Sequence, residues 1–473
     1  MRRKVLFFIP LILAGCAQPD GPSTNQSPSN DFLYDERDAI SSETSLPIPS
    51  IDQRSVVGTR RVLVSVIHWQ DGDALNKNLI EKHTLSTDPD SLHSYVLAAS
   101  YGKLSLTGRV IEYTSGPRPD ICKGGTPLPM SLATAEGNKA ALAHGLLPSS
   151  FSYLINIIDC GGSASAYVPG RIIGVYGQSA SPHVYKHEFG HNLGYSHGQT
   201  YTNCPRDGET VEAPTGCTTI PYGDTGDSVS GGGTLYPASN RSYSGWLDKS
   251  QSAVIERSGL YRLGVLGQVG PQLYRINRTG LTPSQIALEY RKPTIYDDFP
   301  PTDNRVNGVW VRYTTIASSL VNTQLDGTPE TASTTDPTLV KGKTLDDVTA
   351  GITVKMCTSD PSGATVSVAV NRETAPDCDQ PMPQPVTQAP APQAIVGTTP
   401  VFSGHGEPGA KISIRVFKNL TVLQFATIVD AQGAWSVPAS AELSTGEHSF
   451  STQQSINFRM SAWTVKRPFT VKR

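Results

Sequence analysis

The eleven residues from His187 to His197 read HEFGHNLGYSH, and their spacing constrains the fold around them. His187 and His191 are four residues apart, so on a helix their imidazoles lie on one face over successive turns. Gly194 can adopt the left-handed conformation that ends a helix and turns the chain. That turn would let His197 approach the same point from outside the helix. We therefore expect a helix that ends at Gly194, with three histidine side chains converging beside it.

Three converging imidazoles are the ligand set of a catalytic zinc ion whose fourth position stays open to water. Glu188, beside the first ligand, stands where a general base for that water is needed. A bare HExxH pattern arises by chance in many chains. The longer H-E-x-x-H-x-x-G-x-x-H pattern, in a chain with 10 His and 43 Gly, has a chance probability on the order of 10⁻⁵. We predict one Zn²⁺ held by His187, His191 and His197, with Glu188 as the catalytic base; the Asp-rich loops do not specify a calcium site.

This extended motif is that of the metzincin proteases, and the surrounding sequence resembles the gametolysin (autolysin) family. The residues YGD at 222–224 and Asp227 match a "YGD…D" segment of that family, and GW at 245–246 matches a second element. The resemblance covers roughly residues 60–370 and is strongest at 183–247. It implies a zinc endopeptidase of the metzincin class, with a protein or glycoprotein substrate.

One position departs from the family pattern. Metzincins place a methionine-containing turn beneath the three histidines, whereas here Val229 takes the methionine's place and Ser230 is inserted after it. Valine is shorter and stiffer than methionine, so we expect a poorer support for the ligands. The methionine of such turns packs and does not bind metal. Its replacement therefore removes no group that the chemistry requires.

Other residues near the motif receive supporting roles. Gly194 is the expected pivot between helix and third ligand. Asp224 is expected to form an Asx turn or, alternatively, to orient a ligand imidazole. Tyr195 and Tyr222 are additional candidates for hydrogen bonding to a transition state.

The N-terminus has the features of an export signal. Residues 1–15 combine a basic start with the short apolar run VLFFIPLILA, as in signal peptides. They end at LAGC, which resembles the lipobox of bacterial lipoproteins and implies cleavage before Cys16 and lipidation of that cysteine. An ordinary signal peptide or a membrane anchor is the alternative. Residues 16–57, rich in Ser, Pro and Asn, are predicted to be a flexible tether. From the signal and the lipobox we expect an exported chain that is anchored by lipid at the outer membrane or cell surface, or released from it.

Six cysteines remain beyond Cys16, and an even number in an exported chain indicates disulfides. Pairing sequence neighbours keeps each bridge inside one proposed domain. The alternative is that some are free and buried. The expected bridges are Cys122–Cys160, Cys204–Cys217 and Cys357–Cys378.

Composition and periodicity indicate an α+β chain. The formal net charge of −2 argues against a nucleic-acid partner, which would leave a basic footprint. Alternating apolar runs and helical patterns favour a mixed α/β layer that leads into the histidine motif. The resemblance implies that this part, 58–250, is a metzincin-like catalytic domain, a mixed sheet plus active-site helix. Short alternating strands favour β-sandwich domains at 251–375 and 394–473, separated by a Pro-rich linker at 376–393. The last block resembles bacterial Ig-like repeats, which implies spacing or adhesion.

These features lead to one expected function and leave two alternatives. We expect a monomeric zinc endopeptidase that cleaves extracellular or surface proteins. A surface adhesin or glycoprotein-binding lipoprotein with a structural or degenerate zinc site is the first alternative, motivated by the Ig-like block and the missing methionine. A protease directed at glycoproteins or mucins is the second.

Overall fold

The structure is a computed structural model that describes residues 53–123, 130–160, 164–177, 181–331, 333–456 and 459–473. The predicted signal peptide, Cys16 and most of the tether lie outside these residues. From Arg54 onward the chain divides between Ser196 and His197 into two compact units, unit 1 and unit 2, which are described separately. Among the described residues, no helix is long and apolar enough to cross a membrane.

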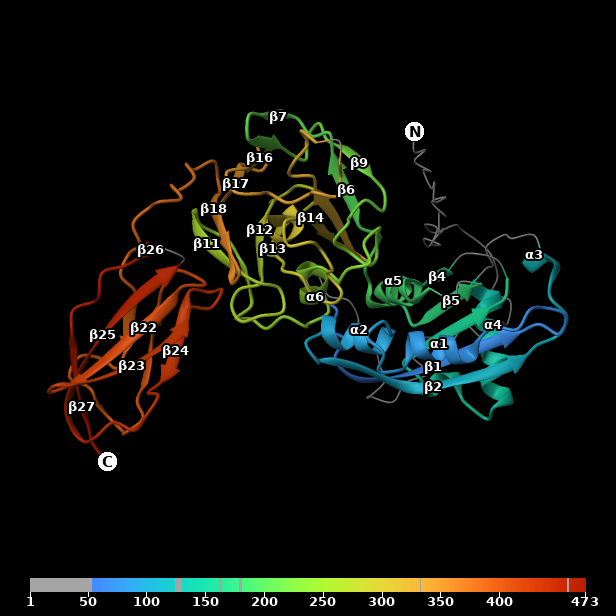
Figure 1. Ribbon diagram of the computed structural model, residues 1–473, viewed down its shortest axis with the longest axis horizontal. Coiled ribbons are helices and arrows are strands. Elements are labelled where there is room, and N and C mark those ends of the chain that lie inside the picture. Colours follow the sequence, from blue (N-terminus) through green and yellow to red (C-terminus); the bar gives the residue numbers. More distant parts are fainter. Residues whose placement is uncertain (1–52, 124–129, 161–163, 178–180, 332, 457–458) are drawn as a thin grey trace, which may run out of the picture. The chain divides into compact units, whose positions relative to one another are not determined.

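Unit 1 is built on a five-stranded mixed sheet (Figure 1). Its strand order is β2-β1-β3-β5-β4, in which β4 is antiparallel to its neighbour and the other four strands are parallel. Every residue of the central strand β3, YLINII, is buried, as expected where both faces of a parallel sheet are covered. The strands are β1 (Gly58–His68), β2 (Leu104–Thr114), β3 (Tyr153–Ile158), β4 (Ala164–Ala166) and β5 (Ile172–Tyr176).

Two helices cover opposite faces of this sheet. Helix α4 (Met130–Ala143) shares a buried cluster with Leu154 of β3. Helix α5 (Pro182–Leu193) places the Phe189 ring 4.7 Å from the ring of Tyr153. Because neighbouring side chains of a strand point to opposite faces, α4 and α5 lie on opposite sides of β3. The remaining helices are α1 (Lys77–Thr84), α2 (Leu92–Ala99), α3 (Asp120–Lys123) and η1 (Pro148–Ser150).

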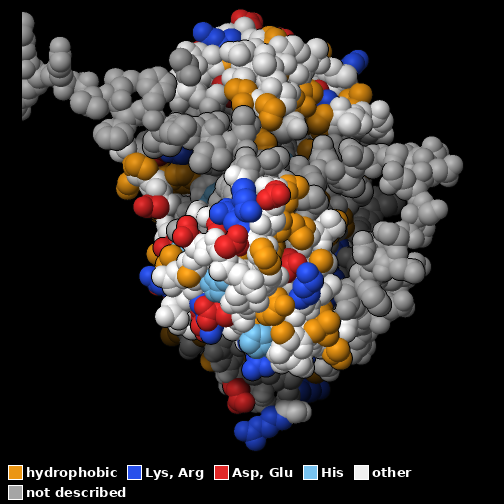
Figure 2. Space-filling view, turned by 90° about the vertical axis from the view of Figure 1, so that its right-hand side faces the viewer, with side chains coloured by type: hydrophobic (Ala, Val, Ile, Leu, Met, Phe, Trp, Pro, Cys, Tyr) orange, Lys and Arg blue, Asp and Glu red, His pale blue; other side chains and the backbone are white. Residues whose placement is uncertain are grey.

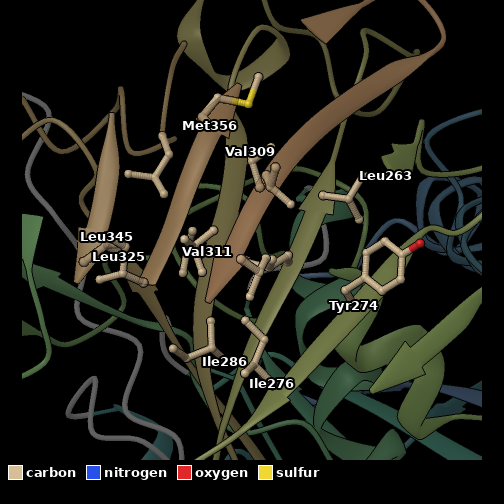
Figure 3. Packing of buried hydrophobic residues seen from close by; sticks show 14 of the residues in the cluster. Leu263, Tyr274, Ile276, Ile286, Val309, Val311, Leu325, Leu345 and Met356 are labelled. Carbon is tan, nitrogen blue, oxygen red and sulfur yellow. The ribbon is translucent and has the colours of Figure 1, made fainter. Parts of the chain in front are cut away.

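Unit 2 begins with two sheets that enclose one apolar core, as the sequence predicted for a β-sandwich. Val311 and Ile286 from one sheet pack with Leu345 and Met356 from the other (Figure 3). The first sheet has the order β10-β12-β13-β14-β15-β6-β9: β10 (Ser252–Val254), β12 (Leu273–Asn277), β13 (Gln285–Tyr290), β14 (Val309–Ile316), β15 (Leu320–Leu325), β6 (Gln199–Thr202), β9 (Thr218–Ile220). The second has the order β11-β18-β17-β16-β8-β7: β11 (Gly259–Gly264), β18 (Gly363–Ala369), β17 (Ile352–Asp360), β16 (Thr344–Asp347), β8 (Thr210–Glu212), β7 (Arg206–Asp207). Helices α6 (Ala238–Tyr243) and η2 (Asn304–Val306) lie in the connections.

Residues 199–220 join the sandwich, although the sequence placed them in the first domain, 58–250. Strand β6 pairs with β15, and β8 pairs with β16. These short strands find partners more than a hundred residues later in the chain, such as Gln324, whose side chain bonds Thr200 at a separation of 124 residues. The residues directly after the histidine motif are therefore built into the β-rich unit.

The C-terminal strands of unit 2 form two further sheets around a separate aromatic core. Phe402 lies with its ring 4.9 Å from that of Phe450 and 6.0 Å from that of Phe469. Part of the predicted linker, 376–393, is a strand of this domain, since β19 pairs with β21. The sheets are β19 (Val386–Ala389), β21 (Val401–His405) and β24 (Ala434–Pro438), and then β20 (Ile395–Val396), β27 (Arg467–Val471), β25 (Gly446–Ile456), β22 (Lys411–Lys418) and β23 (Thr421–Ile428), with β26 (Arg459–Met460) beside β25.

Three disulfides are present in the structure, and their pairs are the sequence neighbours that were predicted. Cys122–Cys160 lies in unit 1, whereas Cys204–Cys217 and Cys357–Cys378 lie in unit 2. Disulfides persist in oxidising compartments outside the cytosol. The three bridges therefore indicate an extracellular or exported protein.

The surface in Figure 2 carries charges of both signs. Among the described side chains visible in this view, acidic and basic groups are interspersed rather than gathered by sign. This distribution agrees with the formal net charge of −2 for the whole chain.

Candidate metal centre

Helix α5 begins and ends where its sequence dictates. Pro182 occupies the first helical turn, where the missing N–H costs no hydrogen bond. Gly194 follows the helix with φ +99°, a left-handed conformation. Its N–H donates to the carbonyl of His191 at 2.8 Å, and the N–H of Tyr195 donates to the carbonyl of Gly190 at 3.0 Å. This pair of bonds is the Schellman motif, so the helix ends at Gly194 as the sequence predicted.

The three predicted ligands lie together. One potential ligand atom from each of His187, His191 and His197 falls within 4.8 Å of the others. The rings of His187 and His191 have centroids 4.9 Å apart and are nearly perpendicular at 82°. His187 and His191 are buried, whereas His197 is half-buried. The arrangement offers three imidazole nitrogens to a single small cation.

The turn after the helix also sets the protonation of His191. Its Nδ1 lies 2.7 Å from the carbonyl oxygen of Tyr195. A carbonyl can only accept, so Nδ1 must carry the proton and donate it. The lone pair of Nε2 is then available to a metal ion, which is the usual arrangement for histidine ligands. Tyr195 thus contributes through its backbone, and its side chain is fully buried.

Glu188 follows His187 on α5 and is buried. Its side chain is 2 % exposed, and burial raises the pKa of its carboxyl to about 8. Its Oε2 has no hydrogen-bond partner among the described residues. An unpaired buried carboxylate oxygen is costly unless a cation or a water satisfies it. Three converging imidazoles with a buried, unpaired carboxylate oxygen on α5 fit a divalent metal ion better than they fit an apolar core.

A loop at residues 222–233, called here the supporting loop, holds the chain next to the third ligand. The carbonyl of Val229 accepts the N–H of Gly198 at 3.2 Å. The hydroxyl of Ser230 donates to the carbonyl of Gly198 at 2.8 Å. Val229 itself is fully buried. The residue that follows His197 is therefore fixed through both of its backbone polar groups.

Asp224 anchors this loop to the sandwich. Its two carboxylate oxygens accept Nε and Nη2 of Arg312 at 2.6 and 3.0 Å. The N–H of Gly226 also donates to Oδ1 at 2.8 Å, which completes an Asx turn. Arg312 in turn donates from Nη1 to Glu289 at 2.6 Å. Of the two roles expected for Asp224, these contacts are those of turn formation.

Burial and charge together set the protonation of this network. Burial alone would raise the pKa of Glu289, but the guanidinium groups of Arg291 and Arg312 lower it to about 2. Asp227 has the opposite balance, because burial, and then the negative charge of Asp224, raise its pKa to about 7. Both arginines are almost fully buried. The sequence singled out neither of them, since an arginine in an alternating strand is typical of a solvent-facing position.

Comparisons with known proteins assign no family. No family model matches the chain, and no curated protein matches it. Solved structures with some similarity include OgpA from Akkermansia muciniphila, 11 % identical over 89 % of this chain and 97 % of the other, with a TM-score of 0.23. The chicken interferon gamma receptor alpha chain is 6 % identical over 25 % of this chain and 65 % of the other, with a TM-score of 0.18. The FN1–FN3 domains of chicken CNTN1 are 4 % identical over 40 % and 61 %, with a TM-score of 0.17. At these TM-scores we draw no inference from the three structures.

Proposed function

We propose that this chain is a zinc-dependent endopeptidase that hydrolyses peptide bonds of extracellular or surface proteins. The observation that carries the proposal is the convergence of His187, His191 and His197 within 4.8 Å. Glu188, next to His187 in the sequence, is buried with an Oε2 that has no hydrogen-bond partner among the described residues. The mixed sheet with α5 on one face supports the metzincin-like assignment that the extended motif implies. The resemblance to the gametolysin family supports the same reaction class.

Each residue has a distinct role in this reaction. Zinc, when bound to the three imidazoles, supplies Lewis-acid activation of a water molecule and of the scissile carbonyl. Glu188 accepts a proton from the attacking water and delivers it to the leaving amine. The carbonyl of Tyr195 keeps His191 in the tautomer whose Nε2 faces the metal site.

The location of the protein supports an external substrate. The three disulfides indicate export. We further propose that Cys16 carries lipid and holds the protein at the membrane surface, with the C-terminal Ig-like domain as a spacer. A lipid-anchored hydrolase of this kind would act on proteins or glycoproteins outside the cytosol.

The test compares three variants of the purified protein. Wild type should contain one zinc ion per chain by metal analysis and should cleave casein in a chelator-sensitive manner. Glu188→Gln should keep the zinc and lose at least about 100-fold in cleavage rate, because it removes general acid–base catalysis. His191→Ala should lose both zinc and cleavage. Glu136→Gln is the matched control, since Glu136 is also a buried glutamate of unit 1 and bonds Ser115 away from the histidines.

The outcomes separate the candidate functions. Undiminished cleavage by Glu188→Gln would exclude Glu188 as the base. Wild type that binds no zinc would exclude the metal site. Zinc-loaded wild type that cleaves neither casein nor a glycosylated protein would support the alternative of an adhesin with a structural zinc. Cleavage of a glycosylated substrate alone would restrict the proposal to a glycoprotein protease.

A further inference from the structure

Tyr222, the first residue of the supporting loop, packs against the third histidine. The ring centroids of Tyr222 and His197 are 4.0 Å apart, and the ring planes are inclined at 39°. Both side chains are half-buried. For comparison, the ring centroids of His187 and His191 are 4.9 Å apart, and those of His183 and His187 are 5.9 Å apart.

The backbone of Tyr222 is in a conformation that tyrosine rarely adopts. Its φ is +58°, in the left-handed region that glycine occupies readily and larger residues seldom do. Its carbonyl accepts the N–H of Gly231 at 3.0 Å, which closes the supporting loop. The next residue but one, Asp224, is fixed by Arg312. The loop therefore determines where the ring lies, and a non-glycine residue is kept there against a local conformational cost.

The three histidines are held in different ways. His187 and His191 project from α5, and His191 also bonds the Tyr195 carbonyl. His197 follows the helix, and its neighbour Gly198 is fixed by Val229 and Ser230. Those bonds set the backbone at the third histidine. The torsion between Cβ and an imidazole ring has a broad potential, so an aromatic ring packed against the imidazole favours one ring orientation.

We propose that Tyr222 is a positioning residue whose aromatic ring, rather than its hydroxyl, holds the imidazole of His197 in the orientation that completes the metal site. This inference rests on the proposed zinc site. The ring of Tyr222 restricts rotation of the half-buried imidazole before any metal arrives, which lowers the entropic cost of binding. Groups that orient metal ligands typically change metal affinity about 10- to 100-fold when removed. We expect the lower end of that range, because packing restrains less than a hydrogen bond.

The experiment uses the strained backbone to separate positioning from stability. Tyr222→Phe keeps the ring and removes the hydroxyl. Tyr222→Gly removes the ring and relieves the left-handed backbone. Zinc affinity is measured by competition with a chromophoric chelator, and the thermal stability of the metal-free protein is measured in parallel. Tyr222→Phe should bind zinc as wild type does. Tyr222→Gly should bind zinc about tenfold more weakly, although the metal-free variant should be at least as stable as wild type.

A second readout and a control complete the design. Replacing zinc by cobalt(II) gives an absorption spectrum that reports ligand geometry, and Tyr222→Gly should alter that spectrum while Tyr222→Phe should not. Tyr261→Gly is the control, because Tyr261 is a half-buried tyrosine of β11 whose ring lies 5.3 Å from Tyr274 in the sandwich. It should leave zinc affinity unchanged.

Three results would overturn the proposal. One is wild-type zinc affinity in Tyr222→Gly. Another is an equal loss in Tyr222→Phe and Tyr222→Gly, which would assign the effect to the hydroxyl. The third is a loss of zinc affinity that only accompanies a fall in metal-free stability. If wild type itself binds no zinc, the proposed function fails as well, so the two failures are distinguishable.

Discussion

Arg312→Met tests whether buried charges in the sandwich hold the supporting loop in place. Arg312 is 1 % exposed and makes three charge-assisted hydrogen bonds, two to Asp224 and one to Glu289. Methionine has a similar length and can occupy the same apolar surroundings without a charge. After the substitution, Glu289 still has Arg291 and the N–H of Ala238. Asp224 keeps the Gly226 N–H but loses the cation that balances its charge.

The expected cost follows from that asymmetry. Removing one partner of a buried ion pair typically costs about 3–5 kcal/mol, because the remaining charge is left without compensation. Since Glu289 retains a second arginine, most of the cost arises at Asp224, and we expect about 3 kcal/mol. Adding Asp224→Asn to Arg312→Met removes the stranded charge and should recover stability. The resulting double-mutant coupling should be roughly 1–3 kcal/mol, the range for residues in direct contact.

Native-state hydrogen exchange is the suitable assay. A chain with two compact units need not unfold in a single transition, so the free energy of unfolding is assigned to the unit that carries the substitution rather than to the whole chain. Exchange reports the opening free energy of individual strands, and β13 and β14 carry the affected residues. Arg305→Met is the matched control, because Arg305 pairs with Asp303 at partly exposed positions and should cost no more than about 1 kcal/mol. The reasoning fails if Arg312→Met costs as little as this control, or if Asp224→Asn gives no recovery.

Three further predictions concern other parts of the chain. Val229→Met should lower the free energy of unfolding in urea by about 1–3 kcal/mol, because it adds volume at a fully buried position. If this variant instead bound zinc more tightly than wild type, valine would be shown to support the three histidines less well than methionine. The pKa of Asp227 is raised from 3.8 to about 7, so the folded state keeps a proton that the unfolded state loses. The free energy of unfolding should therefore fall as pH rises from about 4 to 7 and then level. Asp227→Asn should remove that part of the pH dependence, and an unchanged profile in urea titrations would contradict it. Joint replacement of Cys357 and Cys378 by serine opens a bridge with a sequence separation of 21 and should cost about 3 kcal/mol, measured against wild type in non-reducing urea.

The local features of the site could be predicted from sequence because they depend on near neighbours. The four-residue spacing of His187 and His191 and the conformational freedom of Gly194 determine the end of α5 within one turn of helix. Each of the three disulfides joins neighbouring cysteines, so local pairing was sufficient there too. Short alternating strands likewise indicated the β-rich part of the chain.

The anchoring network could not be predicted, because it depends on strand register over long separations. Asp224 and Arg312 are 88 residues apart. Arg312 comes near Glu289 through the register of β13 and β14, which places Glu289 opposite Trp310 and Ala287 opposite Arg312. The loop that carries Asp224 is held at β15, the next strand, where the Thr225 N–H donates to Gln324. In the sequence, NGVWVRYTT alternates in a way that typically sends its arginine to solvent. Here the supporting loop covers that face, and burial of Arg312 follows from tertiary structure that no local pattern records.

The segment that follows His197 has a support that does not require a methionine at position 229. A methionine under three histidines would act by packing alone. In this chain both backbone groups of Gly198 are bonded to the supporting loop, and the loop is bonded through Asp224 to the buried Arg312, on the face of β14 away from the apolar core. A Cβ on Gly198 would lie 2.9 Å from Cβ of Asp224, so the two segments pack as closely as glycine permits. Rigidity transmitted through hydrogen bonds and an ion pair does not depend on the length of the side chain at Val229. We therefore expect Gly198→Ala, which forces that contact apart, to weaken zinc binding more than any apolar replacement of Val229. Zinc affinities are compared by competition with a chelator. If an apolar replacement of Val229 weakened zinc binding more than Gly198→Ala does, the valine side chain would be the main support.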